Sequence, residues 1–335
     1  MSDFPTLVFV PGAWHRPTCY SKVVRLLQEQ YQLKCSLVTL PSTNGDPEAT
    51  FKDDLDAART AISNETTEGR NVVVIAHSYG GLVGNSAIKG FARPRHDGAV
   101  NSASTSLAAQ TTDQAQSSAS GYVVGLILVA SGFTFTGLSF MDPLLGIPPP
   151  AWKVNKETGF ADIVVPPGEF FYHDLPEDEK EYWVSQLTPQ SLKALFEGGE
   201  YSYSGWKDVP AWYIGTVEDQ GLPVVVQRMN VGMAREMGGT VEHRELQTSH
   251  SPFLSQPDEV VEIMVEAVGA FTGKPVERAG DRAEGRGNRI ISPAARLWQP
   301  LTWLRFGLPL FFGHIIGRGI VAFSWCRRLW RAGLR

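Results

Sequence analysis

The chain has 335 residues, of which 43% are hydrophobic and 19% are charged, and this composition excludes a wholly disordered protein. Residues 286–335 contain nine Arg and no acidic residue, whereas residues 1–285 contain 21 basic and 35 acidic residues, a net charge of −14. An acidic body of this kind lacks the clustered positive charge that a nucleic-acid partner requires.

The beginning of the chain and its cysteines indicate a cytoplasmic protein. Asp3 stands where a signal peptide carries Lys or Arg, and the first apolar run ends at Pro11. Cys19, Cys35 and Cys326 are scattered and form no Cys-x-x-Cys pair, which excludes a disulfide framework and a cysteine zinc site. We therefore expect a reducing compartment.

Short runs rich in Val, Ile and Leu alternate with longer segments of helical periodicity. This pattern predicts an α/β fold, in which a mostly parallel sheet is flanked by helices. The predicted strands are 6–10, 33–40, 71–76, 122–130, 210–215 and 240–246. The first five are nearly continuous in apolar residues, so we expect them to be buried on both faces. Helical faces are predicted at 20–27, 51–62 and 260–267, and the last helix is expected to end near Thr272.

Three segments interrupt this alternation. Residues 98–121 contain 21 Gly, Ala, Asn, Ser, Thr or Gln among 24, which predicts a disordered surface loop. Residues 132–209 separate two strands and hold 14 of the 35 aromatic residues, which predicts an inserted helical lid. Residues 274–289 form a polar linker between a domain at 1–273 and a cationic, hydrophobic tail at 290–335.

The segment Ala76-His77-Ser78-Tyr79-Gly80 joins a predicted strand to a predicted helix. A nucleophile elbow places Ser at the apex of a strained turn and needs small residues two positions before and after it. Ala76 and Gly80 meet this need. The five-residue pattern alone is a weak signal, and its position between strand and helix is what favours Ser78 as a nucleophile. The alternative is an ordinary turn in which Ser78 caps the helix.

A serine nucleophile needs a His base, and the base needs a carboxylate that fixes its tautomer. Of the seven His, His250 follows the last strand and precedes the last helix, which is the position expected of the base. His243 lies within the alternating last strand, where a solvated residue is predicted. His77 is expected to point away from the nucleophile, and His96 and His173 fall in the loop and the lid.

Two adjacent carboxylates, Glu218 and Asp219, follow the strand at 210–215. We favour Asp219 as the acid that orients His250, and an exposed loop carboxylate is the alternative for either residue. Asp142, after the preceding strand, is a third candidate.

The oxyanion hole needs two backbone N–H groups directed at the developing negative charge. We expect one from Tyr79, which follows the nucleophile, and one from Ala13, in the loop after the first strand. Gly12 permits close backbone approach there, although a simple turn is the alternative. His15 either lines the pocket or caps the helix that follows.

In these motifs the chain resembles the α/β-hydrolase superfamily, in the branch of plant methylesterases and hydroxynitrile lyases. It is most similar to fungal hydrolases with a start like Phe9-Val10-Pro11-Gly12-Ala13-Trp14-His15. The resemblance runs from about Thr6 to Thr272 and rests also on the segments 77–81, 218–223 and 249–253. It implies the α/β-hydrolase fold, supports Asp219 as the acid, and implies a place in secondary metabolism.

The chain departs from the plant pattern at two positions. Pro11-Gly12 replaces the His-Gly of the plant oxyanion loop, which changes the pocket wall. Ser251 replaces the Lys that hydroxynitrile lyases carry after the catalytic His, so the cation that stabilises cyanide is missing.

The sequence therefore predicts a serine hydrolase that cleaves an ester, lactone or thioester through an acyl-enzyme. No dinucleotide fingerprint or metal cluster appears, so no cofactor or metal is expected. The alternatives are a lyase, cyclase or cofactor-free oxygenase with His250 as general base, and a binding protein without turnover. A bulky apolar substrate is expected from the aromatic lid residues Phe133, Phe135, Phe140, Trp152, Phe170, Phe171, Tyr172, Trp183 and Trp206.

The tail is predicted to contact a membrane through residues 297–331. Residues 306–326 contain ten Leu, Ile, Phe or Val, but Arg318 lies near their centre, so a spanning helix is marginal. A helix lying in the interface is the alternative, with Trp at headgroup depth and Arg near anionic lipid. A further alternative is a mis-assigned gene end without a selected role.

Overall fold

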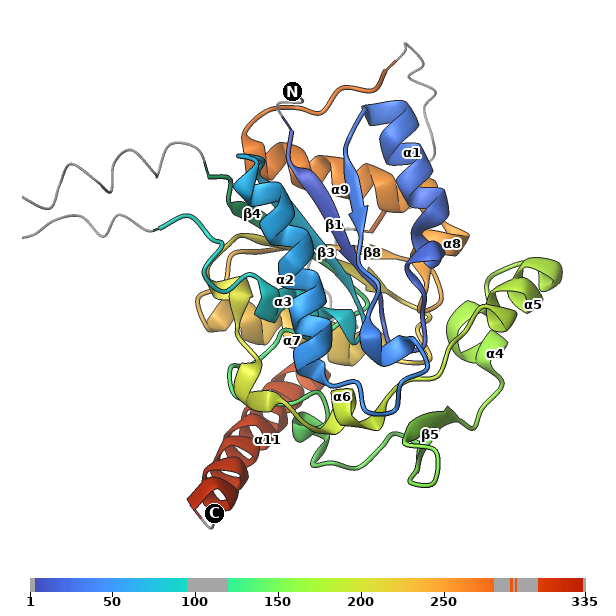
Figure 1. Cartoon of the computed structure of the whole chain (residues 1–335), viewed down its shortest axis with the longest axis vertical. Coiled ribbons are helices and arrows are strands. Elements are labelled where there is room, and N and C mark those ends of the chain that lie inside the picture. Colours follow the sequence, from blue (N-terminus) through green and yellow to red (C-terminus); the bar gives the residue numbers. More distant parts are fainter. Residues whose placement is uncertain (1–3, 95–119, 280–289, 292, 294–306, 334–335) are drawn as a thin grey trace, which may run out of the picture.

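The computed structural model describes residues 4–94, 120–279, 290, 291, 293 and 307–333. Its centre is a six-stranded parallel sheet in the order β2-β1-β3-β4-β7-β8, with helices on both faces (Figure 1). The strands are β1 (Thr6–Val10), β2 (Cys35–Leu37), β3 (Val72–His77), β4 (Val123–Val129), β7 (Ala211–Thr216) and β8 (Val241–Leu246). The α/β fold predicted from the sequence is confirmed.

The main helices lie between the strands, as the periodicity predicts. They are α1 (Ser21–Tyr31), α2 (Phe51–Thr67), α3 (Gly80–Ala87), α7 (Val224–Glu236), α8 (Pro252–Ser255) and α9 (Pro257–Thr272). Helix α2 begins with a capping box, in which Thr50 and Asp53 each accept from the other's backbone N–H. Helix α9 ends at Thr272 because Gly273 takes the left-handed conformation that terminates helices.

The buried core is formed by β1, β3, β4 and β7, whose residues are almost all fully enclosed. The prediction of a doubly buried strand over 33–40 was wrong, because β2 has only three residues and Leu37 is exposed. Strand β2 is at the edge of the sheet and pairs only with β1, so part of it faces solvent.

The last strand holds two buried polar residues, His243 and Glu245, that the sequence did not indicate. His243, predicted to be solvated, is 6% exposed, and burial followed by the charge of Arg235 lowers its pKa to about 3. The neighbouring Glu245 accepts two hydrogen bonds of 2.6 Å from the guanidinium of Arg228. Burial alternates along β8, but helix α7 covers the face that carries His243 and Glu245, so polar residues occupy buried positions there.

The segment 132–209 contains a two-stranded antiparallel sheet as well as helices, so its prediction as helical was incomplete. The strands are β5 (Trp152–Asn155) and β6 (Phe160–Ile163), and the helices are α4 (Pro167–Tyr172), α5 (Glu177–Ser185) and α6 (Leu192–Phe196). Figure 1 shows α4, α5 and β5 beside the body of the sheet rather than within it. Most of the disordered loop predicted over 98–121 lies outside the described residues, which omit 95–119.

The C-terminal helix α11 (Leu308–Gly333) packs against α7 and the loop after β4. The Ser324 hydroxyl donates to the Asp142 carbonyl at 2.9 Å, and the Trp325 indole donates to the Thr136 carbonyl at 3.1 Å. The sequence analysis places this tail outside the domain at 1–273, and the described residues of α11 nevertheless contact that domain. No helix in the described ranges is long and apolar enough to cross a bilayer. Most of the linker 274–289 lies outside the described residues.

Candidate active site

The turn between β3 and α3 holds Ser78 in a strained conformation. Its φ is +50°, in the left-handed region that residues with a side chain rarely adopt. A Cβ on Gly80 would lie 2.2 Å from the Pro11 carbonyl oxygen, so the tight turn requires glycine at this position. The Ser131 hydroxyl donates to the Ser78 carbonyl at 2.6 Å and holds the turn from the β4 side.

Strained residues gather at the same edge of the sheet. Trp14, Ser78 and Ala130 follow β1, β3 and β4, and their φ angles are +61°, +50° and +45°. The carboxyl ends of parallel strands meet at one edge, which brings these three turns together. Such strain persists only where surrounding contacts over-determine the backbone, and it often marks a functional site.

The loop after β8 carries His250, which is 3% exposed. Its Nδ1 lies 2.7 Å from Oδ2 of Asp219 in the loop after β7. Because an ionised carboxylate only accepts hydrogen bonds, Nδ1 carries the proton and Nε2 is left as a base. The described structure contains no hydrogen bond between the Ser78 hydroxyl and His250, and such bonds are often long before substrate binds.

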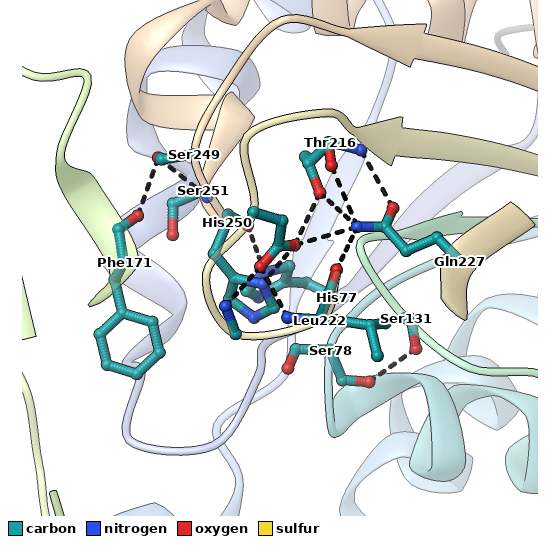
Figure 2. Close-up of polar contacts among 12 residues, drawn as sticks. His77, Ser78, Ser131, Phe171, Thr216, Leu222, Gln227, Ser249, His250 and Ser251 are labelled. Carbon is teal, nitrogen blue, oxygen red and sulfur yellow. Dashed lines mark hydrogen bonds and ion pairs between the residues drawn. The ribbon is translucent and has the colours of Figure 1, made fainter. Parts of the chain in front are cut away.

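Asp219 is held by donors from its own turn and from α7. Figure 2 shows Thr216, Leu222, Gln227 and His250 converging on one carboxylate. Oδ1 accepts the Gly221 and Leu222 N–H groups at 2.7 Å each, and Oδ2 accepts the Thr216 hydroxyl at 2.7 Å. The carboxylate is therefore fixed in position before it contacts the imidazole.

The ionisation of Asp219 follows from these contacts. Burial by itself raises the pKa of this carboxyl, but the charge of His250 and the hydrogen bonds outweigh burial and lower the pKa below its usual value. Asp219 is thus a carboxylate near neutral pH and accepts the hydrogen bond from His250 Nδ1.

The two other carboxylates lie elsewhere. The Glu218 side chain accepts from the Gln247 amide at 2.6 Å, away from His250. Asp142 accepts the Ser139 N–H at 2.8 Å in the loop that contacts α11. Of the three candidate acids, the structure therefore brings Asp219 to His250.

The residue before the nucleophile contacts the base. Figure 2 shows His77 next to His250, and His77 Nε2 donates to the His250 carbonyl at 2.9 Å. The two ring centroids lie 4.7 Å apart. Burial, followed by the charge of His250, lowers the pKa of His77 well below 6.5, so this ring is neutral. The prediction that His77 points away from the nucleophile missed this link between the elbow and the base loop.

The loop after β1 lies directly against the elbow. A Cβ on Gly12 would be 3.1 Å from the Ser78 Cβ and 2.8 Å from His77 Nδ1, so a side chain does not fit here. Ala13 follows and is 5% exposed, and Tyr79 on the other side of Ser78 is fully buried. The two candidate oxyanion donors therefore belong to backbone segments that flank the nucleophile.

Residues 7–263 match the model of the alpha/beta hydrolase family. The chain belongs to this family. Among curated proteins it is 26% identical over 271 residues to the alpha/beta hydrolase nvfD of Aspergillus novofumigatus (strain IBT 16806), a match that covers 79% of this chain and 97% of the relative. The superfamily recognised from the motifs is confirmed.

Solved structures share the fold of this alpha/beta hydrolase at low sequence identity. A pyrethroid hydrolase from Sphingobium faniae JZ-2 is 18% identical with a TM-score of 0.56, over 79% of this chain and 98% of that one. Polyneuridine aldehyde esterase is 17% identical with a TM-score of 0.55, over 79% and 99%. A methylesterase from Arabidopsis is 17% identical with a TM-score of 0.53, over 79% and 99%.

The lid aromatics of this hydrolase serve two purposes. Phe171 lies over the site, with its ring centroid 5.9 Å from that of His250 and 5.0 Å from that of His15. Phe133, by contrast, stacks on Tyr213 of β7 at 5.8 Å, and Trp206 is buried beside it. Phe133 and Trp206 therefore pack within the core, whereas Phe171 faces His250, the candidate base.

Several residues that build the site of this hydrolase carried no signal in the sequence. Gln227 holds Asp219 from α7, Ser131 holds the elbow, and Asp174 accepts the Ser249 N–H at 3.0 Å. Gln227 contacts a turn only eight residues away, whereas Ser131 and Asp174 contact loops that are distant in the sequence, and hydrophobic periodicity indicates none of these polar contacts. His173 donates to the Glu218 carbonyl at 3.0 Å, and His96 lies outside the described residues.

Proposed function

We propose that this alpha/beta hydrolase is a serine hydrolase that cleaves a carboxylic ester, lactone or thioester of an apolar small molecule through an acyl-enzyme. The observation that carries the proposal is the strained Ser78 turn beside the buried pair of His250 and Asp219. Three proteins of the same fold are named as a pyrethroid hydrolase, polyneuridine aldehyde esterase and a methylesterase, which supports ester chemistry.

In the proposed mechanism, Ser78 Oγ attacks the substrate carbonyl while His250 Nε2 takes the hydroxyl proton. Asp219 keeps the proton on Nδ1 and stabilises the imidazolium that forms. The N–H groups of Ala13 and Tyr79 bind the oxygen on which negative charge develops. His250 then protonates the leaving group, and a water molecule activated by His250 hydrolyses the acyl-enzyme and regenerates Ser78.

Hydrolysis is favoured over cyanohydrin cleavage by the residue after the base. Residue 251 is a buried serine, 1% exposed, and a serine supplies no cation that could stabilise a cyanide leaving group. The aromatic ring of Phe171 over His250 supports an apolar substrate. A role in secondary metabolism rests on the sequence resemblance to fungal hydrolases.

The proposed hydrolase also contacts anionic membrane surfaces through the outward face of α11. This proposal is supported by large exposed apolar side chains on that helix, and residues 286–335 carry nine Arg and no acidic residue. The exposed residues are Phe311, Ile315, Ile316, Phe323, Leu329 and Trp330.

A fluorophosphonate probe tests the mechanism, because only an activated serine reacts with it at an appreciable rate. We expect the wild-type chain to be labelled at Ser78, and Ser78→Ala and His250→Ala to lose labelling and esterase turnover while remaining folded. Ser185→Ala, which removes an exposed hydroxyl from α5, is the matched control and should behave as wild type. Turnover within tenfold of wild type in Ser78→Ala would exclude the acyl-enzyme.

A further inference from the structure

The loop that carries Ala13 is held by the lid. The Trp14 carbonyl accepts the Thr188 N–H at 2.9 Å, and the Trp14 indole donates to the Ala161 carbonyl at 2.9 Å. His15 Nε2 lies 2.8 Å from the Tyr172 hydroxyl on α4. All three partners belong to residues 161–188 of the lid, although the loop itself follows β1.

The direction of the hydrogen bonds at His15 is determined by its partners. His15 Nδ1 lies 2.7 Å from the Ala13 carbonyl, which only accepts, so Nδ1 carries the proton. Nε2 must then accept, and the Tyr172 hydroxyl is the donor. Burial lowers the pKa of His15 to about 4, which agrees with a neutral ring in this arrangement. The chain of donors therefore runs from Tyr172 through His15 to Ala13.

The loop needs such support because its backbone is strained. Trp14 has a φ of +61°, which costs on the order of 1–3 kcal/mol for a residue with a side chain. The carbonyl that His15 Nδ1 binds belongs to the peptide group between Ala13 and Trp14. This hydrogen bond therefore helps to hold the turn that orients the Ala13 N–H. Without the lid contacts, the described hydrogen bonds that oppose relaxation of the Trp14 backbone are the two that His15 makes within the loop, from its N–H to the Gly12 carbonyl at 3.3 Å and from Nδ1 to the Ala13 carbonyl at 2.7 Å.

Helix α4 contacts the base loop as well. The Phe171 carbonyl accepts the Ser249 hydroxyl at 2.9 Å, and Asp174, just after α4, accepts the Ser249 N–H at 3.0 Å. The same short stretch of the lid thus binds the oxyanion loop through Tyr172 and the base loop through Ser249. A shift of α4 would move both loops relative to Ser78.

We propose that Tyr172 and His15 are positioning residues through which lid helix α4 sets the oxyanion loop, so that the oxyanion hole is complete only when the lid is in place. The inference rests on the proposed hydrolase function. It makes the lid part of the catalytic geometry, because the contacts of α4 with His15 hold the loop that carries the Ala13 donor.

Tyr172→Phe tests this proposal because it removes only the hydroxyl. Deleting one oxyanion donor costs about 10²–10³-fold in kcat, so a displaced donor should cost about 10- to 100-fold for p-nitrophenyl butyrate, with KM within about twofold. Affinity for a trifluoromethyl ketone, which forms a tetrahedral adduct with Ser78, should fall by the same factor as kcat. Tyr182→Phe, the same change at an exposed lid tyrosine, should alter neither.

A second variant separates positioning from general stability. In His15→Asn the side-chain amide still donates to the Ala13 carbonyl, but the link to Tyr172 is lost. We expect a similar loss of kcat, and adding Tyr172→Phe should cause no further loss, because the two residues act through one connection. Losses that multiply would overturn the proposal, as would a kcat for Tyr172→Phe within twofold of wild type.

Fluorophosphonate labelling keeps this test distinct from the proposed function. If the wild-type chain is labelled at Ser78 and Tyr172→Phe retains kcat, only the coupling between lid and oxyanion loop fails. If wild-type Ser78 is not labelled, the hydrolase function itself fails.

Discussion

The edge of the sheet that carries Ser78 and the C-terminal helix α11 are held in place by different kinds of contact. At the edge, Asp219 and His250 are almost completely buried, and their hydrogen bonds cross from loop to loop. Helix α11 instead combines apolar contacts with α7, such as Gly313 and Gly317 against Met229, with polar contacts at partly exposed positions, such as the ion pair of Arg318 with Glu236, and its outer face is exposed. Directional contacts fix the geometry that chemistry needs, whereas apolar contacts only add stability.

The largest effect is expected from the acid. Asp219→Asn should lower kcat by about 10⁴-fold, because the amide no longer selects the tautomer with a basic Nε2. Glu218→Gln is the matched control, since its side chain contacts Gln247 instead. Steady-state kinetics on one activated ester measure both variants. A larger loss in Glu218→Gln would show that the acid was wrongly assigned.

Gln227 tests whether the contacts behind the acid matter. Gln227→Leu keeps the size of the side chain but removes donors to Asp219 and Thr216, so it should lower kcat by about tenfold and unfolding free energy by about 1–3 kcal/mol. Gln28→Leu, at an exposed position of α1, should change neither quantity. If the two variants gave the same kcat and the same unfolding free energy in urea, the proposed role of Gln227 in supporting Asp219 would be wrong.

Stability should fall in acid because the buried His are neutral in the fold. The pKa values of His15 and His243 are lowered to about 4 and about 3, and that of His77 is also lowered, whereas unfolded His titrates near 6.5. Below pH 6.5 the unfolded chain therefore binds more protons, and the folded state loses stability until these folded pKa values are reached.

Asp54 opposes this effect, because burial raises its folded pKa to about 6 and the fold gains stability as that carboxyl protonates. The three buried His outnumber this carboxyl, and Glu65 and Asp219, whose folded pKa values are lowered, add to the loss, so the unfolding free energy should fall between pH 6 and 4. Urea unfolding at several pH values measures it. A flat profile from pH 7 to 5 would contradict the assignment of neutral buried His.

The smallest effect on catalysis is expected from removing the tail. A chain of residues 1–280 uncovers Leu138 and Met233, which now pack against Val321, and should lose about 3 kcal/mol of unfolding free energy while kcat stays within twofold. Co-sedimentation with vesicles containing phosphatidylserine should be lost with the tail. If full-length protein does not bind vesicles, the membrane proposal fails, and if residues 1–280 do not fold, the domain boundary fails.

The sequence by itself determined the architecture and the order of the catalytic candidates. Apolar runs alternating with helical periodicity specify a parallel sheet, and parallel strands place the ends of β3, β7 and β8 at one edge. Ser78, Asp219 and His250 each follow one of these strands, so their proximity was predictable. Ala76 and Gly80 indicated the strained turn around Ser78, because a nucleophile elbow needs small residues two positions before and after the serine.

Tertiary structure alone decided which neighbouring side chains face one another. Glu218 and Asp219 are adjacent in the chain, and only the turn geometry directs Asp219 to His250. His243 is buried because α7 covers β8, and Tyr172 reaches His15 across 157 residues of sequence. Local periodicity determines the type and burial of an element, whereas side-chain direction in a loop depends on backbone dihedral angles and on partners that only the folded chain brings together.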